Sequence, residues 1–254
     1  AFGTVHRSHS STCGVSKFIS ESAIGYLIKK ELKFLGEIVS NAGEPFLAII
    51  GGAKVADKIK VIDKLFDKVQ ALIIGGGMSC TFLKAQGFEI GNSLFEKDSL
   101  HFAEEMIQKS KEKKIDLLLP KDAIIANSLK EKASIRSIRL SEGVPKGWMM
   151  LDIGSKSAEI FCNAISGSRT VFWNGPMGVF EIEKFSNGTF AIAKSLARET
   201  ERGALTIVGG GDSVSAIKKL GVSEKISHVS TGGGASLKFL EGKELPGISS
   251  IGRS

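Results

Sequence analysis

The 254-residue sequence has few cysteines and no long hydrophobic run. Its three cysteines, Cys13, Cys80 and Cys162, are far apart and form no Cys-x-x-Cys pair, so the sequence excludes a disulfide framework and a cysteine-based zinc site. No apolar run approaches the roughly 18 residues that a membrane span requires, and no short apolar segment with a cleavage site opens the chain. We therefore expect a cytoplasmic protein without a membrane partner.

Two nucleotide-binding fingerprints are also absent. Neither Gly-x-x-x-x-Gly-Lys-Ser/Thr nor Gly-x-Gly-x-x-Gly occurs, which disfavours a P-loop enzyme and a nicotinamide-dependent oxidoreductase. The net charge is +7, but no basic patch is interleaved with aromatic residues, so we expect no nucleic-acid partner. Most lysines alternate with acidic residues, as in 109–114, which is typical of a solvated helix face.

The opening of the sequence has two interpretations. No acidic residue precedes Glu21, whereas Ser, His, Arg and Lys are plentiful, which is the composition of an organellar transit peptide and leaves an organellar form open. The sequence also begins directly with an apolar, strand-like run from Ala1 to Val5, as expected of a chain that is cut within a domain. We favour the second interpretation.

Short apolar runs end in glycine-containing turns at five places. They are residues 46–50 before Gly51, 71–74 before Gly75, 171–173 before Asn174 and Gly175, 205–208 before Gly209, and 228–231 before Gly232. A sixth run, 117–119, ends at a proline, and stretches of helical period at 55–69 and 100–113 lie between the runs. The pattern predicts an α/β fold, a doubly wound parallel sheet with helices on both faces.

Glycine turns at strand ends favour a phosphate site. Ligands of doubly wound sheets bind beyond the carboxyl ends of the strands, where glycines allow close approach and helix starts present N–H groups. Lys54 and Lys58 lie four residues apart at the start of a predicted helix, on one face, where two cations oppose the helix dipole and indicate a bound anion. Asp212 follows a glycine run at another helix start; it could ligate Mg²⁺ on a nucleotide or simply cap the helix.

Several motifs resemble those of the phosphoglycerate kinase family in order and spacing. They are Gly-Gly-Ala-Lys-Val-Ala-Asp-Lys at 51–58, Gly-Gly-Gly-Met at 75–78 with Thr-Phe-Leu at 81–83, Trp-Asn-Gly-Pro-Met-Gly-Val-Phe-Glu at 173–181, Gly-Gly-Gly-Asp at 209–212 and His-Val-Ser-Thr-Gly-Gly-Gly-Ala-Ser at 228–236. The opening Ala-Phe-Gly-Thr-Val-His-Arg-Ser-His at 1–9 is similar to the end of that family's amino-terminal domain.

The resemblance implies a reversible phosphoryl transfer between 1,3-bisphosphoglycerate and ADP that gives 3-phosphoglycerate and ATP in glycolysis. The residues it assigns to catalysis are Lys54, which would stabilise the phosphoryl group in flight, Gly211 and Gly234. It places around the phosphates Lys58, Asn174, Gly210, Gly211, Asp212 as the Mg²⁺ ligand, Ser213, Gly232 and Gly233. It places around adenine and ribose Gly76, Gly77, Leu94, Leu151, Pro176 and Glu181. In the opening segment, Arg7 would contact the 3-phosphoglycerate phosphate, with His6 close by.

The resemblance also implies a domain division. Residues 1–20 would end a truncated substrate domain, 21–41 would be a connecting helix, 42–245 the nucleotide-binding domain and 246–254 a carboxyl-terminal tail. We expect a monomer whose opening residues Phe2, Val5 and Val15 lack packing partners. An alternative for this chain by itself is a nucleotide-binding module without catalysis.

Two positions depart from the family pattern near the expected adenine wall. Met150 stands where many members have Gly, and Ser155 where many have Pro. The sequence therefore leaves the purine preference open.

Overall fold

A computed structural model describes residues 1–19 and 21–251, and its centre is a parallel sheet. The sheet has six strands in the order β3-β2-β1-β7-β8-β9. The strands are β1 (Phe46–Ile50), β2 (Ala71–Ile74), β3 (Asp116–Leu118), β7 (Thr170–Asn174), β8 (Leu205–Gly209) and β9 (His228–Val229). Every pair of neighbours is parallel, and helices cover both faces, so the predicted fold class is confirmed.

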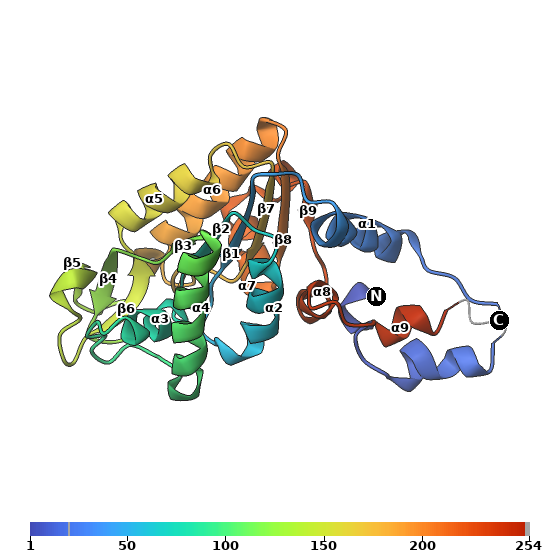
Figure 1. Cartoon of the computed structure of the whole chain (residues 1–254), viewed down its shortest axis with the longest axis horizontal. Coiled ribbons are helices and arrows are strands. Elements are labelled where there is room, and N and C mark those ends of the chain that lie inside the picture. The colour runs from blue at the N-terminus through green and yellow to red at the C-terminus, as the bar shows by residue number, and fades with distance from the viewer. Residues whose placement is uncertain (20, 252–254) are drawn as a thin grey trace.

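Successive residues of each central strand point to opposite faces of the sheet and enter two different cores. In β1, Ala48 and Ile50 join one buried cluster, whereas Leu47 and Ile49 join the other. The first cluster is completed mainly by α1 (Tyr26–Ser40), α2 (Ile59–Phe66), α4 (Leu100–Lys113) and α8 (Gly233–Leu240). The second is completed mainly by α5 (Ser155–Ile165), α6 (Asn187–Glu201) and α7 (Gly211–Leu220), and α3 (Ser79–Ala85) contributes to both (Figure 1). The all-apolar strands are therefore buried on both faces.

A second, antiparallel sheet was not predicted from the sequence. Its three strands run in the order β5-β4-β6 and are β4 (Asp122–Ala126), β5 (Ile135–Arg139) and β6 (Met149–Ile153). Figure 1 shows this small sheet at the far end of the molecule from α1. It packs beside α5 and α6 and forms one wall of the site described below.

The opening segment is packed, which contradicts one expectation. Phe2 and Val5 are buried in the first core, and only Val15 of the three is exposed. The segment returns to the end of the chain, where the N–H of Gly247 on α9 (Pro246–Ser249) donates to the carbonyl of Val5 at 2.9 Å. Figure 1 shows the amino terminus beside α8 and α9. The prediction of unpartnered side chains was therefore wrong for Phe2 and Val5.

Helix α1 covers residues 26–40, a shorter span than the helical stretch expected from 21 to 41. The division into domains stays a prediction; residue 20, which ends the first predicted segment, and residues 252–254 of the predicted tail lie outside the described residues. None of the helices in the described ranges is both long enough and apolar enough to cross a membrane.

Candidate functional site

The topology places a crevice between β1 and β7. From β1 the chain continues through β2 to β3 on one side, whereas β7, β8 and β9 lie on the other. At such a switch point the loops leaving two neighbouring strands diverge and open a crevice beyond their carboxyl ends. Here the N–H of Gly51 donates to the carbonyl of Asn174, and that of Gly52 to the carbonyl of Pro176, both at 2.9 Å. Two of the predicted glycine turns therefore lie side by side.

Glycine is required at these turns for packing as well as for ligand access. Gly175 has φ = 99°, and a Cβ there would lie 2.2 Å from the carbonyl oxygen of Gly51. Gly76 has φ = 62°, and a Cβ there would lie 2.6 Å from the nitrogen of Gly52. Gly211, in contrast, has no atom within 4 Å of a Cβ position, so its face is open to a ligand.

A polar cavity of about 330 Å³ lies in this crevice. Its lining comes from the turns after β1, β7 and β8 and consists of Gly52, Ala53, Lys54, Asp57, Lys58, Asn174, Gly175, Gly210, Gly211, Asp212 and Ser213. Seven of the residues that the sequence assigned to catalysis, phosphates or metal are therefore together in one cavity. The position of Gly211 at the start of α7 also directs that helix's amino end to the cavity.

The ammonium group of Lys58 is enclosed by the turns around it. Its Nζ donates to the carbonyls of Gly51 at 2.6 Å and Asn174 at 3.2 Å. Burial lowers the pKa of Lys58 to about 8, although Asp212 and Asp57 oppose the shift. Because the ammonium group is buried, its electrostatic attraction to an anion that enters the cavity is strong.

Both cavity lysines precede the helix on which they were predicted to lie. Helix α2 begins at Ile59, Lys58 ends a 3₁₀ turn, and Lys54 lies in the loop before that turn. The prediction that both share a face at the start of the helix was therefore wrong. Both nevertheless line the polar cavity, because the loop folds back over the end of β1.

The buried amide of Asn174 lacks a donor contact. Its Nδ2 has no hydrogen-bond partner among the described residues, although the atom is buried. A buried donor without a partner is costly, and a ligand oxygen in the cavity would satisfy it. The neighbouring Oγ of Ser213 already accepts the N–H of Gly175 at 2.6 Å. Asn174 thus fits a contact to an anionic ligand, and Ser213, besides holding the turn in place as an acceptor, has an O–H that no described residue accepts and that is free to donate.

An apolar cavity of about 260 Å³ adjoins the polar one, and the two share Gly52, Ala53 and Asp212. Its remaining lining consists of Gly76, Gly77, Leu94, Leu129, Met149, Met150, Leu151, Asp152, Pro176, Met177, Gly178, Val179 and Glu181. All six residues that the sequence assigned to adenine and ribose are among them. Leu94 and Leu129 are 72% and 55% exposed, so apolar side chains stand at an open mouth that a flat, apolar ligand group would cover.

The remaining predicted site residues lie beside the polar cavity rather than in its lining. A Cβ on Gly233 would be 3.2 Å from the Cα of Gly210, which places the start of α8 next to that of α7. A Cβ on Gly234 would be 3.3 Å from Nε2 of His6, and Nε of Arg7 lies 3.5 Å from the same nitrogen. Burial and the nearby Arg7 lower the pKa of His6. The opening segment therefore brings its histidine and arginine to the edge of the site.

Sequence reasoning missed part of the lining. In the polar cavity it missed Gly52, Ala53, Asp57 and Gly175, although all four lie within the quoted motifs. In the apolar cavity it missed Leu129, Met149, Asp152, Met177, Gly178 and Val179. The last three follow Pro176 directly and lie within the quoted motif at 173–181, so its glycine and apolar residues could have been assigned to the site. Leu129, Met149 and Asp152 belong to the small sheet and its connections, which carried no recognised pattern.

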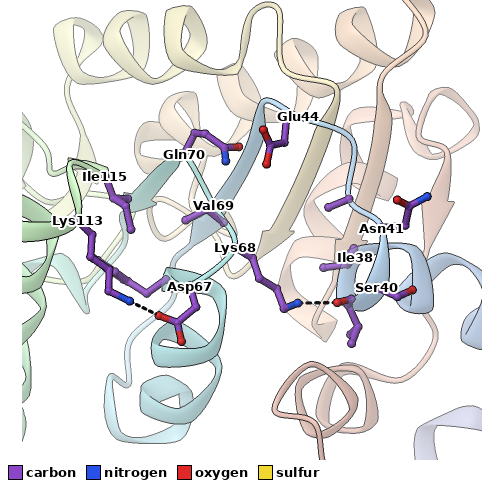
Figure 2. A pocket seen from close by; sticks show the side chains of 13 residues that line it. Ile38, Ser40, Asn41, Glu44, Asp67, Lys68, Val69, Gln70, Lys113 and Ile115 are labelled. Carbon is purple, nitrogen blue, oxygen red and sulfur yellow. Dashed lines mark hydrogen bonds and ion pairs between the residues drawn. The ribbon is translucent and has the colours of Figure 1, made fainter.

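Cavity size does not identify the site. A cavity of about 590 Å³ lies at the opposite, amino-terminal edge of the sheet (Figure 2). There Lys68 donates to the carbonyl of Val39 at 2.6 Å, and the ammonium of Lys113 contacts the carboxylate of Asp67. These groups already satisfy one another. The cavity at the carboxyl edge differs because it has glycine turns, an unpartnered amide and an enclosed ammonium.

Comparisons with known proteins agree with this geometry. The family model described as phosphoglycerate kinase matches residues 1–243. Proteins named phosphoglycerate kinase from Clostridium botulinum strain Hall and Thermosipho africanus are 56% and 52% identical over 251 residues, which is 99% of this chain and 62% of each relative. The solved phosphoglycerate kinase of Coxiella burnetii is 42% identical with a TM-score of 0.91, covering 98% of this chain and 64% of that one. That of Pyrococcus horikoshii is 30% identical with a TM-score of 0.84, covering 99% and 62%.

Proposed function

This chain belongs to the phosphoglycerate kinase family, and we propose on that premise that it supplies the nucleotide-binding part of an enzyme that transfers a phosphoryl group between 1,3-bisphosphoglycerate and ADP. The chain spans about 62% of the length of its curated relatives, so the activity, the triose substrate and the partners are proposals for the whole protein. We further propose that this protein is monomeric and cytoplasmic.

The observation that carries the proposal is the joined pair of cavities at the switch point. A nucleotide has a charged phosphate chain at one end and a flat, mainly apolar base at the other. The polar cavity offers Lys54, Lys58 and the amide of Asn174, and the apolar cavity offers Leu94 and Leu151. Because the two cavities share three residues, one nucleotide can occupy both ends at once.

The residues of the polar cavity suit direct transfer. In phosphoryl transfer the enzyme contributes chiefly positioning and stabilisation of charge on the moving group. We propose that Lys58 and the backbone N–H groups of Gly210 and Gly211 hold the nucleotide phosphates. Lys54 then offsets the charge that develops on the phosphoryl group in flight. The amides of Gly232, Gly233 and Gly234 approach from the neighbouring helix start.

Asp212 fits one ligand position of a nucleotide-bound Mg²⁺. Its carboxylate lines the polar cavity at the first turn of α7, and carboxylate oxygen is the ligand type that Mg²⁺ prefers. The described residues contain no cluster of three or more His, Cys, Asp or Glu that could hold a metal without the nucleotide. Bound Mg²⁺ would neutralise charge on the phosphates. We therefore propose that the ion arrives with the nucleotide and that Asp212 orients it.

The base end is proposed to take adenine. Gly76, Gly77, Leu94, Leu151 and Pro176 would contact the ring, and Glu181 the ribose hydroxyls. Met150, which stands where many family members have Gly, lines this cavity, and it also joins the second core, where its Sδ lies 3.8 Å from Sγ of Cys80. A methionine in place of glycine thus adds a side chain to the cavity wall.

The test is calorimetric titration of this chain with MgADP and, separately, with 3-phosphoglycerate. We expect saturable, one-site binding of MgADP, and only weak binding of 3-phosphoglycerate, because His6 and Arg7 are the only triose contacts proposed here. Absence of MgADP binding by folded protein would count against the nucleotide site. Tight 3-phosphoglycerate binding would show that the triose site is complete in this chain.

A further inference from the structure

A buried carboxylate forms part of the inner wall of the apolar cavity. Asp152, on β6, is 1% exposed. Its Oδ2 accepts the N–H of Gly188 in the first turn of α6 at 2.8 Å, and its Oδ1 accepts the N–H of Ile153 at 2.9 Å. Asp152 therefore joins the strand that carries Leu151 to the amino end of α6.

The same helix end holds the turn that carries Pro176. Oγ1 of Thr189, one residue beyond Gly188, accepts the N–H groups of Met177 at 3.0 Å and Gly178 at 3.2 Å. This turn is also bonded to β6, because the N–H of Val179 donates to the carbonyl of Leu151 at 2.9 Å. Strand β6, helix α6 and the turn 176–179 are thus bonded in a closed triangle.

The contacts of this triangle leave no spare volume around the carboxylate. A Cβ on Gly178 would lie 2.3 Å from Oδ1 of Asp152, and a Cβ on Gly188 would lie 2.4 Å from the same atom. Gly178 in the turn and Gly188 on α6 are therefore both packed closely against the carboxylate of Asp152. A shift of the Asp152 side chain moves the helix end and the turn together, because cores at this density transmit displacements.

We propose that Asp152 is a positioning residue that sets the geometry of the base end of the nucleotide site, by holding α6 and the Pro176–Val179 turn at a fixed distance from Leu151. The inference rests on the proposed nucleotide function. It goes beyond that function because both carboxylate oxygens of Asp152 accept backbone N–H groups, so its role is to hold the elements around the base end together. The phosphate end is lined mainly by the turns after β1 and β8, with only Asn174 and Gly175 from the loop after β7, so it should respond less than the base end to the loss of Asp152.

The neighbouring strand of the same sheet provides a matched control. Asp122 on β4 is also buried, and its carboxylate accepts the N–H groups of Lys156 at 3.1 Å and Ser157 at 2.7 Å in the first turn of α5. A Cβ on Gly154 would lie 2.2 Å from Oδ2 of Asp122. A glycine is therefore packed against this carboxylate too, as Gly178 and Gly188 are against that of Asp152. Asp122 lines neither end of the nucleotide site. Its loss should cost stability without changing base recognition.

The experiment compares two probes on the full 254-residue chain, MgADP and magnesium pyrophosphate, which shares the phosphates and lacks the base. Asp152→Asn keeps the size of the side chain and at most one of its two acceptor contacts. We expect it to weaken MgADP binding about tenfold and magnesium pyrophosphate binding less than about twofold. Thr189→Val, which removes the acceptor for the N–H groups of Met177 and Gly178, should weaken MgADP binding selectively in the same way. Thr189→Ser, which keeps the hydroxyl, should bind both probes as the unaltered chain does. Asp122→Asn should lower the melting temperature and leave both affinities unchanged.

Each outcome decides a different claim. Equal losses for both probes in Asp152→Asn would overturn the positioning role, because they would reflect general loosening of the domain. The same selective loss in Asp122→Asn would also overturn it. If the unaltered chain binds pyrophosphate but not MgADP, the base site itself is wrong. If the unaltered chain binds neither probe, the proposed nucleotide function fails before Asp152 is in question.

Discussion

Glu31 on α1 and His228 on β9 are buried against each other, with Oε2 and Nε2 2.8 Å apart although 197 positions separate them in the chain. Phe34 stacks on the imidazole at a centroid distance of 4.6 Å, and the N–H and hydroxyl of Thr231 both donate to Oε1 of Glu31 at 2.7 Å. This contact ties α1 to β9, the strand that leads into the glycine turn at 232–234.

Glu31→Gln should destabilise the chain by about 2–3 kcal/mol, because one charged partner of a buried hydrogen-bonded pair is removed. Burial alone would raise the pKa of Glu31, but hydrogen bonds from His228 and Thr231 lower it below 4.5. The contribution is therefore complete above pH 4.5 and is lost as the pH falls through the folded-state pKa. Urea unfolding at pH 7 and below pH 4 measures the difference. Glu37→Gln on the same helix, where the side chain has no hydrogen bond or ion pair within the described part, should be neutral.

MgADP binding should take up a proton above pH 8. The pKa of Lys58 is about 8 in the ligand-free chain, so the group is partly neutral there, and a bound phosphate favours its charged form. Calorimetry in buffers with different ionisation enthalpies gives the number of protons taken up. Affinity should fall as the pH rises from 8 toward 10.5. Lys58→Met should abolish the uptake, and the exposed Lys64→Met should leave it intact; uptake that survives Lys58→Met would assign it to another group.

The stability of the native chain relative to Asp152→Asn should fall as the pH rises. The contribution of Glu31, in contrast, is lost as the pH falls. Burial raises the pKa of Asp152 to about 7, above the ordinary 3.8, although the N–H groups of Gly188 and Ile153 oppose the shift. Between these values the folded state holds a proton that the unfolded state has lost. The native chain should therefore lose up to about 1.4 kcal/mol per pH unit relative to Asp152→Asn as the pH rises from 4 to 7. A flat difference over this range would show that the carboxyl is charged throughout.

In the complete enzyme, Lys54→Ala should lower kcat about a hundredfold or more with a small change in nucleotide KM, because its proposed contact strengthens in the transition state. Lys58→Ala should raise the nucleotide KM as well. Steady-state kinetics with varied MgADP separate the two effects. A Lys54→Ala enzyme with unchanged kcat and a raised KM would place Lys54 in ground-state binding only.

The 254-residue chain should bind MgADP yet transfer phosphoryl groups on the order of a thousandfold more slowly than the complete enzyme, since charge on the moving group is then offset from one side only. A coupled assay on the chain alone, and then mixed with the remaining portion of a relative, measures this. Recovery on mixing would support the proposal. Near-normal turnover by the chain alone would contradict it.

The parallel sheet could be predicted because its signal is local. Each of its apolar runs is short and is followed by glycine or proline, and Leu100–Lys113 has a helical period that α4 matches at both ends. The small sheet carried weaker signals. β5 is mostly exposed and has the sequence Ile-Arg-Ser-Ile-Arg, without strict alternation of apolar and polar residues, and β6 follows Trp148 without glycine or proline between them. Such strands are defined by cross-strand contacts that a single segment does not display.

The site could be predicted where it depends on motifs, and not where it depends on distant contacts. Lys54, Lys58 and Asp212 lie within glycine-rich segments whose chemistry can be read directly. Asp152 gains its role from Gly188, 36 positions away, and Phe2 from a core completed by residues near the other end of the chain. The register of Lys54 and Lys58 was wrong because periodicity alone could not show that the α-helix starts only at Ile59.

The contact between Val5 and Gly247 also sets the order of events during synthesis on the ribosome. Phe2 and Val5 share a core with Leu240 and Leu245, so the first of these residues to emerge must wait for the last. Until then two large apolar side chains near the amino end of the chain remain uncovered, in a nascent polypeptide that already contains its central strands. The Phe2–Val5 segment is therefore synthesised well before the residues that bury it, and it stays unpacked for longer than the strands that lie between them.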